Sequence, residues 1–421
     1  MFFTSLSFQL TDAQKRVIQE VVTDLSKNFP MNRLVQGEVG SGKTVVAAAV
    51  IYLAHLNNLK SIIMAPTEIL AFQHFDTLSR LLEPFGIKVG IYTGSRKRIQ
   101  GDLPVIVGTH ALLSKSLELN NVGLVVVDEQ QRFGVEQRTL LRDKAESPHF
   151  LTMTATPIPR TVALTIYGDL DLSVIDQMPV GRKVVRTYFV PQSKRLDAYK
   201  FIENHIKEEE QAYIITPLIE ESETQASAKA AKVEYERLQK QVFPKLRLGL
   251  LHGRLKSKEK EAAINAFKNH ELDILVSTSV VEVGVDVPNA TIMVIEGGER
   301  FGLAQLHQLR GRVGRGEQQS YAFLFTEEEN PQVINRLKNL ERIHDGLTLS
   351  ELDLKIRGGG EVFGTAQSGR WNLKIASLSN LSLIEKTRAA AQKVLAQDPS
   401  LDKYPNLKRK LSSLAPEVSP D

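Results

Sequence analysis

Residues 37–44 read Gly37-Glu38-Val39-Gly40-Ser41-Gly42-Lys43-Thr44, and this stretch decides the fold around it. A short apolar run at Leu34 and Val35 precedes the stretch, and a long run of small apolar residues follows it. This order predicts a strand, a glycine-rich turn and a helix. In such a turn, glycines let successive backbone N–H groups point inward at one anion at the N-terminus of the helix.

The end of this loop carries the chemistry. Lys43 is expected to place its ammonium on the β- and γ-phosphates of a bound nucleotide, and Thr44 to offer its hydroxyl to Mg²⁺. The alternative is a loop that only turns the chain, and the length of the match in this context disfavours it. The loop therefore predicts that the protein binds a nucleoside triphosphate together with Mg²⁺.

The composition limits the class of protein. A chain of 421 residues is long enough for two or three domains, and the absence of cysteine excludes disulfides and cysteine-based metal sites. The first residues lack the features of a signal peptide, and no apolar run reaches the length of a membrane span, so we expect a cytoplasmic protein. The net charge of +4 is compatible with a nucleic-acid partner without indicating one.

A helical pattern occupies residues 8–25, with Thr11 or Asp12 as the expected N-cap. Two residues of this segment point to the nucleotide. A glutamine ahead of a phosphate loop, here Gln14, can hydrogen-bond both edges of adenine, and an aromatic residue such as Phe8 can stack on the ring. Taken alone this indication is weak, because most such glutamines are simply solvated.

Short apolar runs alternate with helical patterns along most of the chain. Near-continuous apolar strands of this kind are typical of a parallel sheet covered by helices on both faces. The first set lies at residues 61–65, 88–92, 105–107, 124–127 and 150–153, and the second at 186–190, 212–215, 246–251, 274–276, 292–295 and 321–325. We therefore predict an α/β fold of two similar lobes, of which the first binds nucleotide.

The predicted domains are residues 1–180, 181–340 and 341–421, with the linker between the lobes at 179–182. Residues 221–241 are polar and rich in alanine, which indicates a long exposed helix. The last domain lacks the recurring short apolar runs that indicate strands. It is expected to be helical, with a glycine-rich interruption at 358–360 and a frayed tail from residue 416.

Two acidic residues, Asp128 and Glu129, end the most apolar strand of the first lobe. Ligands bind at the carboxyl edge of a parallel sheet, so these carboxylates are expected beside the phosphate loop. Asp128 would hold Mg²⁺, and Glu129 would orient and deprotonate the attacking water. An ordinary acidic pair at a strand end is the alternative, and the phosphate loop upstream favours the catalytic interpretation.

A second group, Gln308 to Gly316, interleaves three arginines with three glycines. Arg312 and Arg315 are three residues apart, so on a helical or turn segment they point the same way. Facing the γ-phosphate across a cleft, both would stabilise the charge that develops during phosphoryl transfer. A structural salt bridge is the alternative, but such bridges rarely need glycines between the arginines.

Together these stretches resemble the superfamily 2 helicases, and among them most closely the RecG family of branched-DNA helicases. The resemblance runs through nearly the whole chain, and the motifs are highly specific in this order. It rests on residues 34–44, 65–71, 107–112, 128–130, 132–134, 154–161, 217–222, 277–291, 300–316 and 357–369.

The resemblance implies two tandem RecA-like lobes of the P-loop NTPase type, followed by a helical region with a translocation motif. It also implies ATP and Mg²⁺ as cofactors, branched duplex DNA as the partner, and a monomeric motor in repair and recombination. Residues 154–156 would link the catalytic strand to the cleft between the lobes. Gly284, Asp286 and Gln308 would approach the nucleotide from the second lobe.

The family's DNA-facing positions grip phosphates through hydroxyl and amide groups without reading the sequence. In this chain the resemblance assigns them to Pro66, Thr67, Thr109, Arg160, His252, Thr278, Arg357 and Gln367.

Three residues depart from the family pattern. Gln131 stands where His is usual and cannot become cationic, which bears on the coupling between hydrolysis and DNA contact. Glu38 replaces the usual Asp at a position outside the phosphate contacts, and Gly359 replaces a common Pro. The chain also begins just ahead of Phe8 without the family's N-terminal wedge domain, so we expect either a fragment or a motor alone.

Two other functions stay open at this point. The translocase module of a transcription-repair coupling factor is disfavoured by Ser41 and Gln130, where that family is expected to carry Phe and Glu. A DNA-binding nucleotide switch without motor activity is suggested by Gln131, while the intact carboxylates and arginines count against it. The nine histidines are scattered and support no further metal or cofactor site.

Overall fold

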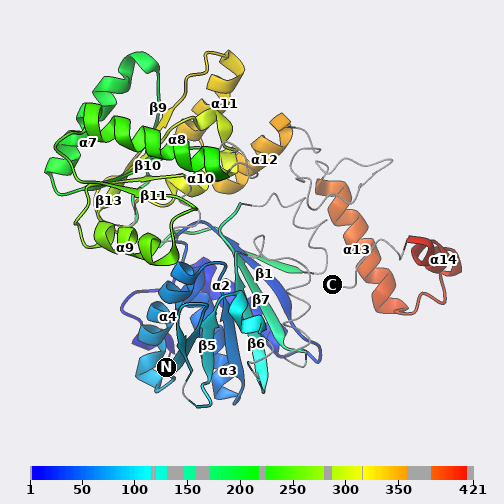
Figure 1. The fold of residues 1–421 in the computed structure, drawn as a ribbon. Helices are drawn as coiled ribbons and strands as arrows, with labels where there is room; N and C mark the ends of the chain where they lie inside the picture. Colours follow the sequence, from blue (N-terminus) through cyan, green and yellow to red (C-terminus); the bar gives the residue numbers. More distant parts are fainter. Residues whose placement is uncertain are drawn as a thin grey trace.

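The computed structural model describes residues 2–99, 101–114, 117, 120–129, 147–157, 170–179, 181–217, 224–278, 287–314, 316–357 and 381–414. Within these ranges the chain forms two α/β lobes, and further helices follow the second lobe (Figure 1). The predicted fold class is confirmed.

The first lobe is built on a sheet whose described strands are ordered β4-β3-β5-β2-β6-β7-β1-β8. Neighbouring strands are parallel except for β3 and β4. The strands are β1 (Asn32–Gly37), β2 (Lys60–Met64), β3 (Val89–Tyr92), β4 (Lys97–Arg98), β5 (Val105–Gly108), β6 (Val122–Asp128), β7 (His149–Thr154) and β8 (Asp171–Ile175). The helices are α1 (Phe2–Ser5), α2 (Asp12–Leu25), α3 (Lys43–Leu56) and α4 (Glu68–Leu82).

Successive residues of a strand point to opposite faces of a sheet, and both faces of this sheet are covered. In β6, Val126 packs into the cluster that includes α2, α3 and α4, while Val125 and Val127 pack into a cluster on the other face. In β2, Ile63 packs into the first of these clusters and its neighbour Ile62 into the second. The apolar character of these strands is therefore continuous because neither face meets water.

The second lobe has a parallel sheet in the order β11-β12-β10-β13-β14-β9 among the described strands. The strands are β9 (Arg186–Val190), β10 (Gln211–Ile215), β11 (Leu248–Leu251), β12 (Ile274–Ser277), β13 (Ala290–Ile295) and β14 (Tyr321–Phe325). The helices are α7 (Arg195–Lys207), α8 (Thr224–Arg237), α9 (Ser257–Lys268), α10 (Leu303–Arg310), α11 (Pro331–Arg342) and α12 (Gly346–Arg357).

Two more helices, α13 (Leu381–Gln397) and α14 (Pro405–Leu414), lie to one side of the lobes (Figure 1). The Arg388 side chain of α13 donates a hydrogen bond to the carbonyl oxygen of Leu170 in the first lobe (3.1 Å). α13 therefore contacts the first lobe, which lies earlier in the chain.

The structure refines three predictions. The edge strands β4 and β8 were not expected from the apolar runs. α8 is not simply exposed, because Ala231 and the following Leu238 are completely buried. Residue 340, where the sequence predicts a boundary, lies inside α11, and Leu349 of α12 is buried in the core of the second lobe. The domain boundaries stay predictions.

A buried charge network ties α2 to the sheet of the first lobe. Asp24 accepts hydrogen bonds from Arg33 Nε and Lys27 Nζ, both at 2.6 Å, and Arg33 also donates to the hydroxyl of Ser173 (2.7 Å). Burial by itself would raise the pKa of Asp24. The hydrogen bonds from Arg33 and Lys27 outweigh that effect and hold the pKa below its usual value of 3.8.

Replacing Arg33 by alanine is expected to lower the free energy of unfolding by about 3 kcal/mol, because Asp24 keeps a buried charge without its main partner. In the unmodified chain, the stabilisation from the lowered pKa is fully present above pH 3.8 and is lost as the pH falls below it. Denaturant unfolding near neutral pH and in acid measures both effects. An Asp24→Asn chain should lose less stability on acidification than the unmodified chain, and an equal loss would contradict the assignment.

Candidate functional site

The phosphate loop lies between β1 and α3, as the sequence predicts. Gly40 and Gly42 have φ values of +79° and +85°, in the left-handed region that favours glycine. Lys43 is the first residue of α3, and its ammonium donates to the carbonyl oxygens of Gly37 (2.8 Å) and Glu38 (3.0 Å). Backbone carbonyl oxygens of the loop therefore hold the Lys43 ammonium in place.

Neither of the two residues predicted to bind adenine is among the residues that line the pocket between the lobes. Gln14 is buried in α2, where its amide donates to the carbonyl oxygen of Ser41 (2.8 Å) and accepts from the backbone N–H of Thr11 (2.9 Å). Both polar ends of Gln14 are thus occupied within the protein, and the side chain supports the phosphate loop. Phe8 is 49% exposed. Contact of either residue with adenine stays a prediction.

Asp128 ends β6 with only 8% of its surface exposed, and its Oδ2 lies 2.7 Å from Nε2 of His74 on α4. Burial by itself raises the pKa of a carboxyl group. The hydrogen bond from His74 and the nearby charge of Lys43 outweigh it, so the pKa of Asp128 lies below its usual value. Asp128 is therefore an ionised acceptor, and His74 Nε2 carries the proton between them.

Glu129 follows Asp128 with a φ of +52°, a left-handed conformation that is uncommon outside glycine. This turn brings its carboxylate to the end of the neighbouring strand β7. There the backbone N–H of Ala155 donates to it (3.4 Å), and the Thr154 hydroxyl lies 3.5 Å away. Strained backbone of this kind clusters at functional sites, where surrounding contacts hold the residue in place.

A hydrogen-bonded path continues from Glu129 to the second lobe. The backbone N–H of Thr156 donates to the Thr154 hydroxyl (3.0 Å), and the Thr156 hydroxyl accepts from Nε2 of Gln308 on α10 (2.7 Å). Gln308 is thus placed on Thr156 and does not line the pocket. Residues 154–156 therefore connect the end of β7, beside Glu129, to α10 of the second lobe.

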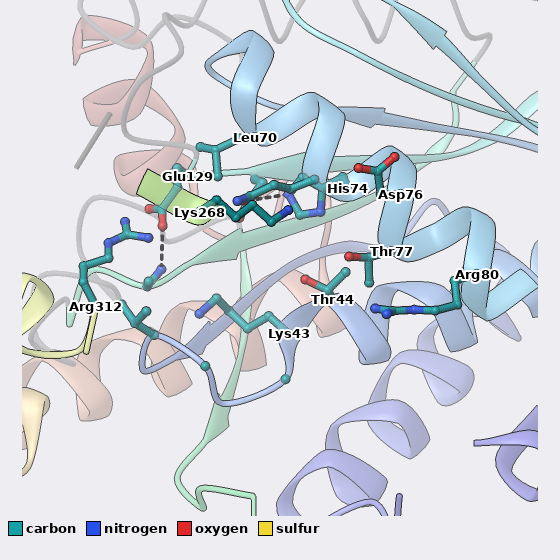
Figure 2. Close-up of a pocket in the computed structure, with 16 residues that line it drawn as sticks. Lys43, Thr44, Leu70, His74, Asp76, Thr77, Arg80, Glu129, Lys268 and Arg312 are labelled. Atoms are coloured by element: carbon teal, nitrogen blue, oxygen red, sulfur yellow. Dashed lines mark hydrogen bonds and ion pairs between the residues drawn. The ribbon is translucent and has the colours of Figure 1, made fainter. Parts of the chain in front are cut away.

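Both lobes line a pocket of about 560 Å³ (Figure 2). The first lobe contributes the phosphate loop, one side of α4 and the two carboxylates, and the second contributes Lys268 of α9 and Arg312 after α10. Its cationic side chains are Lys43, Arg80, Lys268 and Arg312. Its carboxylates are Asp76, Asp128 and Glu129. A pocket of this size, with four cations beside carboxylates, fits a polyphosphate with its counter-ion.

The phosphate loop is also fastened to the second lobe. Glu38 Oε1 accepts from the backbone N–H of Gly346 at the start of α12 (3.1 Å) and lies 3.3 Å from Nε2 of His307 on α10. Arg310 donates to His307 Nδ1 (2.8 Å), so the Nε2 proton faces Glu38. Burial alone would raise the pKa of Glu38, but the hydrogen bonds from His307 and Gly346 hold it below the usual value.

The connection between the lobes adds a second fastening. Arg182 donates to the carbonyl oxygens of Val39 in the phosphate loop and of Gly311 after α10 (3.1 Å for Gly311). The sequence predicts a linker here and gives this arginine no role. In the structure the linker itself holds the phosphate loop against the second lobe.

Replacing Glu38 by glutamine is expected to separate the lobes more often. The amide keeps the shape of the side chain but loses its charge, and a hydrogen bond to a charged group contributes about 1.5–3 kcal/mol against about 0.5–1.5 kcal/mol for a neutral one. Because the chain has no cysteine, Lys15→Cys in the first lobe and Lys207→Cys in the second can carry a dye pair. Energy transfer between the dyes measures the fraction of separated lobes. A Glu327→Gln chain, altered at an exposed position, should behave as the unmodified chain does.

Three family models match the chain in succession. The DEAD/DEAH box helicase model matches residues 11–165, and the helicase conserved C-terminal domain matches residues 193–317. The model of the C-terminal part of domain 3 of the ATP-dependent DNA helicase RecG matches residues 343–415. The chain is a helicase core of the RecG type.

Relatives of the RecG-type core share its sequence over almost its whole length. The ATP-dependent DNA helicase RecG of Synechocystis is 48% identical over 97% of this chain, and that of Aquifex aeolicus is 46% identical over 96%. A structure of RecG bound to a three-way DNA junction superposes with a TM-score of 0.74 at 44% identity over 86% of this chain. The chain spans about half of each of these proteins, namely 50%, 53% and 49%.

Five of the residues that the family resemblance assigns to DNA lie where strands of the RecG-type core end. Pro66 and Thr67 follow β2, Thr109 follows β5, and His252 and Thr278 follow β11 and β12. Pro66, Thr67 and His252 are half-buried, while Thr109 and Thr278 are only 2% and 4% exposed. The hydroxyls of Thr109 and Thr278 are therefore covered in this arrangement, and their contact with DNA stays a prediction.

Several predicted residues lie outside the described part of the chain. They are Gln131, Arg160, Gly284, Asp286, Arg315, Gly359 and Gln367. Arg357 is the last residue of α12. Among the helices that the structure describes, none combines the length and the apolar character needed to cross a bilayer.

The structure brings other residues into or near the site that sequence reasoning missed. His74, Arg80 and Lys268 line the pocket, and no local pattern of residue types marks them. A third histidine near carboxylates, besides His74 and His307, is His205, which approaches Glu208 and Glu210, with 2.9 Å between His205 Nδ1 and Glu210 Oε2. This cluster precedes β10, so it lies at the edge of the second sheet opposite to the one that carries the predicted motifs.

Proposed function

We propose that this RecG-type core hydrolyses ATP to move along branched duplex DNA, the activity of a motor in repair and recombination. The observation that carries the proposal is the pocket between the lobes, in which a phosphate loop and two carboxylates meet Arg312 and Lys268 from the second lobe. A site completed only when two lobes approach each other can convert a chemical step into a relative movement of those lobes.

The residues of the first lobe provide the binding and the base. Lys43 would turn its ammonium from the loop carbonyls to the β- and γ-phosphates. Glu129, anchored by Ala155, would orient the attacking water and accept its proton. Arg312 would approach the γ-phosphate from the other lobe and stabilise the charge that develops there, with Arg315 as a second predicted cation.

The donor set of the site fits Mg²⁺. Thr44 and Asp128 line the same pocket with oxygen atoms, the ligands that this ion prefers, and the lowered pKa of Asp128 keeps its carboxylate ionised. These two residues would hold the ion. When bound, Mg²⁺ neutralises charge on the β- and γ-phosphates during transfer.

DNA is the proposed track. The predicted DNA contacts follow strand ends in both lobes. A change in the distance between the lobes would therefore change the spacing between the contacts that each lobe makes with the DNA backbone. The RecG structure that superposes on this chain is bound to a three-way junction, which supports a branched substrate.

The test is ATP hydrolysis by the chain alone, with linear duplex DNA and with a model three-way junction. We expect DNA to stimulate hydrolysis, most strongly the junction, and the stimulation to weaken as salt is raised. A rate of hydrolysis that DNA does not change would contradict the proposal and favour a nucleotide switch. Displacement of a stalled RNA polymerase without action on junctions would favour a transcription-repair coupling module.

A further inference from the structure

α4 lays one of its faces along the nucleotide pocket. Leu70, Gln73, His74 and Thr77 follow the spacing of one helical face and all line the pocket. Figure 2 shows Leu70, His74 and Thr77 on this helix, around the space that Lys43 enters. Among the described residues of this face, His74 is the one with a hydrogen bond to a catalytic carboxylate, at Asp128.

We propose that His74 is a positioning residue that orients the Asp128 carboxylate for Mg²⁺, an inference that rests on the proposed ATPase site. The bond of 2.7 Å holds Oδ2 and thereby sets the rotation of the carboxylate about its side chain. The other oxygen is then presented in a defined direction. Groups that hydrogen-bond to a metal-binding carboxylate in this way typically change metal affinity or activity by about 10–100-fold when they are removed.

The surroundings of His74 suit this task. The residue is 7% exposed, so its bond to Asp128 does not compete with bulk water. The helix that carries it begins at a capped end, where the Thr67 hydroxyl accepts from the backbone N–H of Leu70 (3.4 Å). An imidazole N–H donates to a carboxylate without a long flexible stem. A lysine at this position would bring a mobile cation to the place where Mg²⁺ binds.

The experiment measures ADP binding by calorimetry in magnesium chloride and in EDTA, so the readout does not depend on turnover. In the unmodified chain, Mg²⁺ should raise the affinity for ADP. In His74→Leu we expect that gain to fall about tenfold, with the affinity in EDTA unchanged. In His74→Gln, whose Nε2 amide can donate to the same oxygen, most of the gain should return.

A matched control is His149→Leu, which removes another imidazole of the first lobe. Its Nδ1 accepts from the backbone N–H of Met31 (3.0 Å) at the opposite end of β7, away from the pocket. This chain should keep the full effect of Mg²⁺. If His74→Leu does not fold, His74→Asn serves instead, because its shorter amide stays polar but falls short of Asp128.

A folded His74→Leu or His74→Asn chain with an undiminished gain from Mg²⁺ would overturn the proposal. So would a His74→Gln chain that loses as much of the gain as His74→Leu. Failure of the proposed function is separate and would show as ATP hydrolysis without response to DNA. In that case the effect of Mg²⁺ on ADP binding still decides the role of His74.

Discussion

Replacing Arg312 by alanine is expected to lower kcat for ATP hydrolysis by about a thousandfold, the lower end of the effect of an arginine that stabilises the transferring phosphoryl group. Arg312 belongs to the second lobe but lines the pocket that holds Lys43 and both carboxylates. Its charge matters most while negative charge builds up on the phosphate oxygens. ADP affinity, measured by calorimetry, should therefore change much less than kcat.

Arg312→Lys separates charge from geometry. It keeps the cation but loses the planar fork of the guanidinium, so its kcat should lie between those of the alanine variant and the unmodified chain. Arg342→Ala, which removes an exposed arginine at the end of α11, should leave hydrolysis unchanged. An Arg312→Ala chain that hydrolyses ATP at the normal rate would show that the second lobe does not complete the site.

Replacing Lys43 by alanine is expected to reduce kcat by about 10²–10³-fold, as the removal of one preorganised donor to a developing charge commonly does. DNA-stimulated hydrolysis should disappear with it. The variant also lacks the ammonium that would contact the β- and γ-phosphates, so binding of ATP should weaken as well. A steady-state assay that follows phosphate release, with and without a DNA junction, measures these effects.

The control for Lys43 is Lys15→Ala, which removes an exposed lysine from α2 without touching the pocket. Its hydrolysis should equal that of the unmodified chain, with the same response to DNA. Unchanged hydrolysis in Lys43→Ala would contradict the ATPase assignment as a whole. If only the stimulation by DNA were lost, Lys43 would be needed to couple DNA binding to hydrolysis and not for hydrolysis itself.

The sequence predicted the parts of this site that short stretches of chain encode. The phosphate loop follows from the spacing of its glycines before Lys43, and the position of Asp128 follows from the apolar strand that ends there. Parallel strands bring their carboxyl ends to one edge, so Asp128 was predicted beside the loop without any knowledge of tertiary contacts. Arg312 was predicted from residue types that a buried core does not need.

The parts that were missed depend on contacts between distant segments. His74 and Asp128 are 54 residues apart in the chain, and Glu38 and Gly346 are 308 apart. The periodicity of apolar residues does not predict such long-range contacts, because each residue fits the ordinary pattern of its own helix or loop. β8 was missed for a different reason. Its five residues, Asp171 to Ile175, mix exposed, half-buried and buried positions and include two polar residues, so they do not form a continuous apolar run.

The hydrogen bond between Glu38 and the first backbone N–H of α12 connects the phosphate loop of the first lobe directly to a helix that follows the second sheet. The same loop that would receive the nucleotide stabilises the positive end of a helix whose last residue is Arg357. Any ligand that shifts α12 must change the free energy of the loop, and any nucleotide that reshapes the loop must change the free energy of α12 by an equal amount. The two processes are therefore linked: if a ligand at α12 changes the affinity of the loop for nucleotide by some factor, the nucleotide changes the affinity for that ligand by the same factor.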